Sequence, residues 1–77
     1  MKVYPNPVKD ILFINTNIDE PRNSYLYLRN ISGQLIYEIS DLKKGELFID
    51  VSDFKPGLYF LQINNGQSSR TIKVSVE

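Results

Sequence analysis

Short runs in which every second residue is apolar constrain the fold of this chain more than any other feature. Residues 46–51 (ELFIDV) are an example, in which Leu47, Ile49 and Val51 alternate with Glu46, Phe48 and Asp50. Successive side chains of a β-strand point to opposite faces of a sheet, so such a run predicts a strand with one buried face. No segment shows the three-four spacing of an amphipathic helix over a useful length. The pattern therefore predicts an all-β fold.

Turn residues divide this pattern into about six strands. Gly33 is expected to supply a positive φ in one turn, Pro56-Gly57 fits the central pair of a type II turn, and Asn65-Gly66 is typical of a tight hairpin. The polar stretch 17–23 is predicted to be a loop. With Val3-Tyr4 paired as a seventh strand, the chain is expected to form a small two-sheet antiparallel sandwich. The predicted strands are 11–15, 24–30, 34–39, 46–51, 58–64 and 71–76.

The apolar faces of these runs define a predicted hydrophobic core. Tyr59 belongs to this set, and its position near a strand start allows two roles. Its hydroxyl could bond to an upstream backbone group, as in a tyrosine corner, or the ring could simply pack. The predicted core residues are Leu12, Ile14, Leu26, Leu28, Leu35, Leu47, Ile49, Tyr59, Leu61, Ile63, Ile72 and Val74.

Composition excludes several classes of function. The chain has 77 residues, 42% of them hydrophobic, which suits one small globular domain. Nine basic residues balance nine acidic ones, and no nucleic-acid partner is expected, because phosphate binding needs clustered Lys and Arg. The chain has no His and no Cys, and its acidic residues match no calcium-loop spacing. A Ser–Lys nucleophile pair from Ser68-Ser69 and Lys73 is disfavoured, because these residues lie in a predicted hairpin flank. We therefore predict no catalytic residue, no cofactor and no metal.

Four short blocks stand out in order along the chain. They are Tyr4-Pro5-Asn6-Pro7, Ile31-Ser32-Gly33, Pro56-Gly57-Leu58-Tyr59, and the final strand with Lys73. The two prolines of the first block impose a stiff, extended backbone. We expect them to lead the chain into the first strand and to block edge pairing. A role of this block in recognition is the alternative.

In this order, the blocks resemble the type A C-terminal sorting domain of proteins exported by the type IX secretion system of Bacteroidetes-type bacteria. The resemblance covers residues 4–76 and implies an immunoglobulin-like antiparallel β-sandwich. It also implies a single domain, residues 1–77, at the end of a larger secreted protein. Family members often end with further Lys or Arg, whereas this chain ends in Glu77. The resemblance assigns the sorting-signal motif to Tyr4, Pro5, Asn6, Pro7, Gly33, Pro56, Gly57, Tyr59, Lys73, Val74, Ser75, Val76 and Glu77.

The resemblance implies a non-catalytic signal that directs a folded cargo out of the cell. The implied partners are the type IX translocon and its shuttle components, a sortase-like surface peptidase, and an N-terminal cargo domain. The implied location is secreted or cell-surface, reached via the periplasm and the outer membrane. A small fibronectin-like or carbohydrate-binding β-sandwich module of a surface protein is the alternative function. It would use the aromatic residues expected opposite the core, which are Tyr25, Tyr27, Phe48 and Phe60.

Overall fold

The computed structural model describes residues 2–16, 24–42, 45–64 and 68–77, and every predicted strand is present in it. The described residues form no helix, and therefore none long and apolar enough to cross a membrane. The segment before Pro5 is paired, so the seventh strand is confirmed. The strands are β1 (Lys2–Tyr4), β2 (Ile11–Thr16), β3 (Tyr25–Asn30), β4 (Leu35–Ser40), β5 (Gly45–Asp50), β6 (Gly57–Asn64) and β7 (Ser69–Val76).

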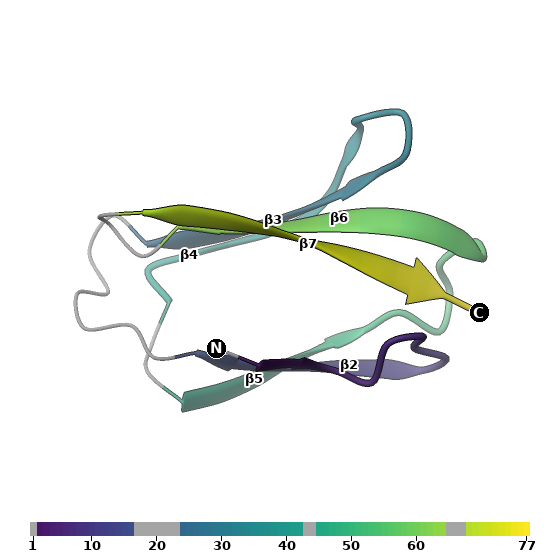
Figure 1. Ribbon diagram of the computed structural model, residues 1–77, viewed down its shortest axis with the longest axis horizontal. Coiled ribbons are helices and arrows are strands. Elements are labelled where there is room, and N and C mark those ends of the chain that lie inside the picture. The colour runs from purple at the N-terminus through teal and green to yellow at the C-terminus, as the bar shows by residue number, and fades with distance from the viewer. Residues whose placement is uncertain (1, 17–23, 43–44, 65–67) are drawn as a thin grey trace.

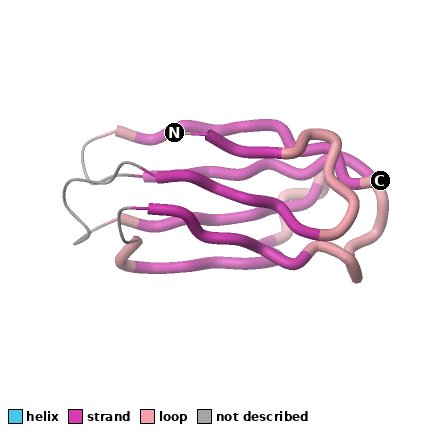
Figure 2. Tube along the Cα trace, turned by 90° about the horizontal axis from the view of Figure 1, so that it is seen from below, coloured by secondary structure: helices cyan, strands magenta, loops and turns pink. Residues whose placement is uncertain are grey.

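The strands form two antiparallel sheets that pack face to face (Figure 1). One sheet has the order β1-β2-β5 and the other the order β4-β3-β6-β7. All seven strands run roughly along the long axis of the molecule (Figure 2). This order is that of an immunoglobulin-like sandwich in which the fourth strand joins the larger sheet. The prediction of an all-β, immunoglobulin-like sandwich of about six to seven strands is confirmed.

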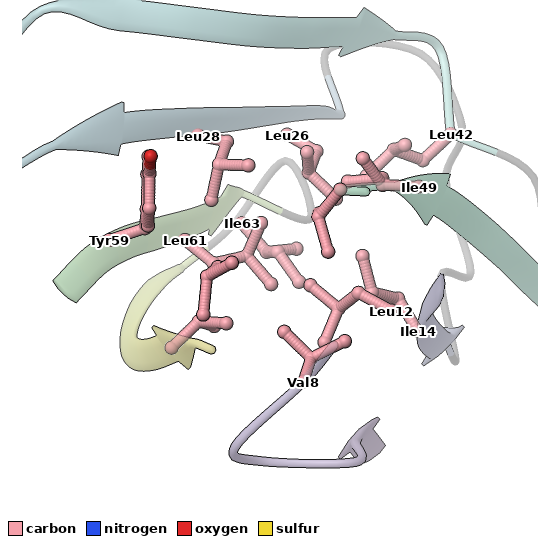
Figure 3. Close-up of a cluster of buried hydrophobic side chains, with 13 residues drawn as sticks. Val8, Leu12, Ile14, Leu26, Leu28, Leu42, Ile49, Tyr59, Leu61 and Ile63 are labelled. Carbon is pink, nitrogen blue, oxygen red and sulfur yellow. The ribbon is translucent and has the colours of Figure 1, made fainter. Parts of the chain in front are cut away.

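Side chains from both sheets meet in one hydrophobic core (Figure 3). Most of the predicted core is confirmed, with Leu47 and Ile72 packed against it from half-buried positions. Four buried residues are absent from the predicted core list. Val51 and Val76 continue the inward faces of predicted strands, whereas Val8 and Leu42 were not expected in the core. Val8 lies between β1 and β2 and Leu42 lies between β4 and β5, so neither belongs to an alternating run. The buried hydrophobic residues are Val8, Leu12, Ile14, Leu26, Leu28, Leu42, Ile49, Val51, Tyr59, Leu61, Ile63, Val74 and Val76.

The prediction that Leu35 lies in the core is wrong, because its side chain is 39% exposed. A β-bulge is the cause. Leu28 pairs with Tyr37, but the next residue, Arg29, pairs with Leu35 and skips Ile36. Side chains alternate along a strand, so one extra residue moves those beyond it to the opposite face. Leu35 therefore shares the outer face of the sheet with Arg29.

The positive φ angles predicted at two turns are confirmed, but one turn type is wrong. Gly33 has φ 84°, and its N–H donates to the Asn30 carbonyl oxygen at 3.0 Å to close the β3–β4 hairpin. Gly57 has φ 149°, far from the roughly +80° of the third residue of a type II turn. It is already the first residue of β6, so Pro56-Gly57 is not the centre of such a turn. The predicted loop at 17–23 and the predicted hairpin turn at Asn65-Gly66 lie outside the described residues.

Candidate functional site

Three of the four sequence blocks meet at the C-terminal part of the chain, residues 73–77, which we call the tail. The third block pairs with one edge of the tail, because Gly57 lies opposite Val76 in the β6–β7 ladder. The end of the first block lies along the other edge, where Val8, the residue that follows the block, forms an isolated parallel bridge with Val76. Segments from the two ends of the chain and from the start of β6 therefore lie side by side.

The middle block lies at the same end of the larger sheet. Asn30, the last residue of β3, pairs with Tyr59 near the start of β6. The turn that contains Gly33 follows directly. Figure 1 shows this hairpin tip at the same end of the long axis as the C-terminus. The fold thus gathers all four blocks at one end of the sandwich.

The side chains of the tail alternate between the two faces of the sheet. Val74 and Val76 are buried in the core, and Lys73 is exposed on the outer face. Ser75 is half-buried, and Glu77 follows the strand in an exposed position. The tail is therefore an integral part of the sandwich that also offers exposed charges.

Four hydrogen bonds join Asn6 of the first block, and Val8 just after it, to the tail. We call the residues that make them the end clasp (Asn6, Val8, Lys73, Ser75 and Glu77). The Asn6 side chain uses both polar atoms: Nδ2 donates to the Lys73 carbonyl oxygen at 2.9 Å, and Oδ1 accepts from the Ser75 N–H at 3.0 Å. The Val8 N–H donates to the Ser75 carbonyl oxygen, and the Val8 carbonyl accepts from the Glu77 N–H, both at 2.8 Å. The first block thus covers the outer edge of β7 like a short parallel strand.

The prolines of the first block mark where the chain changes sheets. β1 ends at Tyr4, and Pro5 cannot extend its ladder because proline has no N–H. The peptide bonds that precede Pro5 and Pro7 are both cis. Val8 then inserts its side chain into the core and is fully buried. The edge of β7 is covered at this point, but Asn6 and Val8 cover it, and not the prolines to which this role was assigned from the sequence.

Tyr59 forms a tyrosine corner next to the tail. Its hydroxyl donates to the carbonyl oxygen of Lys55 at 2.7 Å. The Phe54 ring packs against it with 5.5 Å between ring centroids. Of the two predicted roles, the tyrosine corner is therefore confirmed. Because Tyr59 pairs with Val74, this bond fixes the strand on which the tail rests.

Asn30 organises the hairpin tip of the middle block. Its Oδ1 accepts hydrogen bonds from the N–H groups of Ser32 (3.0 Å) and Gln34 (2.9 Å), as in an Asx turn. The Arg29 guanidinium donates to the Gly33 carbonyl oxygen at 3.2 Å. The tip is therefore exposed but held in one conformation by its own side chains.

Tyr4, although part of the first block, faces away from the end clasp. Its ring stacks on Phe13 with 5.6 Å between centroids, and its hydroxyl donates to Glu46 Oε2 at 2.5 Å. This hydrogen bond raises the pKa of Tyr4 above its usual value, with smaller contributions from desolvation and from the Glu46 charge. Phe48 lies opposite Phe13 in β5 and is 65% exposed. We call Tyr4, Phe13 and Phe48 the aromatic row.

The arrangement offers surfaces and strand edges. Ser69 and Lys73 are four residues apart on one strand, which separates them by about 13 Å and leaves no hydrogen bond between them. In the part of the chain that the structure describes, no group of three or more His, Cys, Asp or Glu is placed to hold a metal ion. The same residues include no buried side-chain nitrogen or oxygen without a hydrogen-bond partner. What this end presents to solvent is the exposed charges of Lys73 and Glu77.

Two contributors to this end were not predicted from the sequence. Val8 was not assigned to the core, and no partner was predicted for the Asn6 amide. One signal was present, because Val8 is a single aliphatic residue within the polar and proline-rich stretch 5–10. Its burial depends on a change of sheet that the sequence pattern does not reveal.

These features define a small β-sandwich module in which segments near the two ends of the chain are hydrogen-bonded to each other at one surface. The family model of the secretion system C-terminal sorting domain matches residues 2–77, and the chain belongs to this family of type IX secretion domains. The comparison with curated proteins gave no match. Membership implies that the protein carrying this domain is secreted or displayed at the cell surface. It also implies an interaction with the type IX secretion machinery.

Proposed function

We propose that the chain is a non-catalytic sorting signal that directs a cargo domain, placed before it, through the type IX translocon. The route runs via the periplasm and across the outer membrane, with shuttle components as further partners. A sortase-like surface peptidase then removes the domain, and the cargo is attached to the surface or released. The gathering of the four sequence blocks at one end of the sandwich carries this proposal, because a receptor can contact exposed residues of several blocks at that end.

Within this proposal, the motif residues divide into two groups. Val74, Val76 and Tyr59 hold the strand in place, because their side chains are buried. Lys73 and Glu77 are exposed and supply charges that a receptor can contact. The non-catalytic part of the proposal is supported by a sequence that has no His and no Cys.

Secretion of a fluorescent reporter fused before the chain, in a type IX-competent host, tests the proposal. The intact chain should bring the reporter to the medium or the cell surface. Deletion of residues 73–77 removes two buried valines and the end clasp, and this reporter should accumulate in the periplasm. Lys73→Ala should hardly change stability, because an exposed charge contributes little, so a loss of secretion in this variant reports recognition.

Two results would count against the proposal. Efficient secretion of the reporter that lacks residues 73–77 would contradict the role of the tail. Retention of the intact reporter, correctly folded in the competent host, would contradict the sorting function itself.

A carbohydrate-binding or fibronectin-like module is a second candidate, and the aromatic row favours it. Exposed aromatic rings on a flat sheet are typical of binding surfaces. An open depression lined by Lys2, Val3, Tyr4 and Asn15 adjoins the row. The fold alone does not decide between the two functions. Phe48→Ala separates them: if it abolishes binding to a glycan panel and leaves secretion unchanged, the aromatic row serves binding, whereas no glycan binding by the intact chain removes this candidate.

A further inference from the structure

Strand β4 is an unpaired edge of the larger sheet, and it carries exposed apolar side chains. It is the terminal strand of the four-stranded sheet, and no described residue pairs with its outer side. The β3–β4 hairpin bends away from the three-stranded sheet toward its tip (Figure 1). Four large apolar residues are exposed there: Ile31 (74%), Leu35 (39%), Ile36 (38%) and Tyr37 (40%).

The hydrogen bonds of the hairpin identify the backbone groups that point outward. The Asp41 N–H donates to the Ser24 carbonyl oxygen at 2.8 Å, so this residue faces β3. Backbone groups in an antiparallel ladder alternate in direction from one residue to the next. Ile39 therefore also faces β3, whereas Glu38 and Ser40 direct their N–H and C=O groups away from the sheet. These outward groups are the ones that an added strand would use.

The other edges of the sandwich carry features that prevent strand addition. The end clasp covers the C-terminal half of the β7 edge. β1 has three residues and is followed by Pro5, and short edges ending in proline resist pairing. β5 carries the charged residues Glu46 and Asp50. On β4, by contrast, Leu35, Ile36 and Tyr37 form an apolar run at the edge, a composition that favours pairing with another strand.

We propose that β4 accepts an extended strand from a partner protein, which adds as a fifth strand to the sheet β4-β3-β6-β7. The partner backbone pairs with Glu38 and Ser40. Its apolar side chains cover Leu35 on the outer face of the sheet and Tyr37 on the opposite face. At the Glu38 end of this edge the described charges, Glu38 and Asp41, are acidic, so the partner strand carries basic side chains there. Arg29, which pairs with Leu35 nearer the hairpin tip, donates its guanidinium to the Gly33 carbonyl oxygen. Pairing with a second copy is disfavoured, since it would bring these acidic residues together.

The acceptor edge adjoins the hairpin tip of the middle block, so it continues the end of the sandwich proposed to be recognised during sorting. Addition of a partner strand to β4 can be measured without secretion. The inference rests on the proposed sorting function only in the reporter experiment, where secretion is measured.

Glu38→Pro blocks the edge without disturbing the hairpin. Proline removes the outward N–H of Glu38, which the β3 ladder does not use, and proline is tolerated at such edge positions. Glu38→Ala is the matched control, because it removes the charge and keeps the N–H. Reporter secretion should fall roughly tenfold for Glu38→Pro, and by less than about fivefold for Glu38→Ala. Normal secretion of a folded Glu38→Pro reporter, or equal losses in both variants, would overturn strand addition while leaving the sorting function intact.

Amide hydrogen exchange of the unmodified chain tests the same edge without secretion. The probe is a synthetic eight-residue peptide of alternating Val and Lys, compared with one of alternating Val and Glu. The Val–Lys peptide should slow exchange at Glu38 and Ser40 and leave Ile39 unchanged, and the Val–Glu peptide should have a weaker effect. No slowing by either peptide at millimolar concentration would overturn the proposal. Sedimentation showing a concentration-dependent dimer that protects Glu38 would also overturn it, because a second copy would then be the occupant.

Discussion

Replacement of Asn6 by Ala should loosen the tail without altering the hydrophobic core. The change removes the hydrogen bonds from Nδ2 to the Lys73 carbonyl and from the Ser75 N–H to Oδ1. Each such bond contributes roughly 0.5–1.5 kcal/mol net, and water replaces part of it at this exposed site, so the free energy of unfolding should fall by about 1–2 kcal/mol. One kcal/mol shifts Tm by about 4–8 °C in a domain of this size, so Tm should fall by roughly 4–16 °C.

Thermal unfolding followed by circular dichroism measures this effect. Asn6→Asp should destabilise at least as much, because its carboxylate places an acceptor against the Lys73 carbonyl where the wild type has a donor. Asn15→Ala is the matched control, since Asn15 is exposed and makes no side-chain hydrogen bond in the described part of the chain. Hydrogen exchange at the Ser75 amide should accelerate in Asn6→Ala. The same Tm and the same Ser75 exchange rate as in the wild type would refute the role of the end clasp.

Three further perturbations test the core, the tyrosine corner and the acid response. Leu61→Ala should cost about 2–5 kcal/mol, against roughly 5 kcal/mol of total stability, so urea unfolding should find the variant barely folded; an unchanged midpoint would place Leu61 outside the core. Tyr59→Phe should lose about 1 kcal/mol, because the hydroxyl bond to Lys55 disappears, and an unchanged Tm would show that this bond contributes nothing. Hydrogen bonds from the Ser52 hydroxyl and N–H lower the pKa of Asp50, so this interaction stabilises the fold above the usual Asp pKa and is lost as pH falls through the lowered value. Ser52→Ala should weaken this acid-side loss in pH-dependent melts, and identical profiles would contradict the coupling.

The alternation of apolar residues was sufficient to predict the strands and most of the core. It succeeds because one buried face imposes a period of two, as in β6, where Tyr59, Leu61 and Ile63 all point inward. The tail follows the same rule with Val74 and Val76. Positive φ at Gly33 could also be predicted, because a tight turn there favours a residue without a Cβ.

The errors lie where the chain departs from regular alternation. The bulge at Ile36 moves Leu35 to the outer face of β4, and no local pattern marks it. Val8 and Leu42 enter the core from connections between strands, where periodicity carries no information. The Asn6 contacts require β7 to lie beside the first block, which depends on the packing of two sheets. The candidate site could therefore be listed from the sequence as separate blocks, but its assembly at one end needed the structure.

The most direct test of the sorting function compares the same reporter fusion in two hosts. One host has a working type IX system, and the other lacks the translocon. The sorting function predicts reporter at the surface or in the medium of the first host, and folded reporter in the periplasm of the second. Equal secretion by both hosts, or periplasmic retention in both with the domain folded, would contradict it.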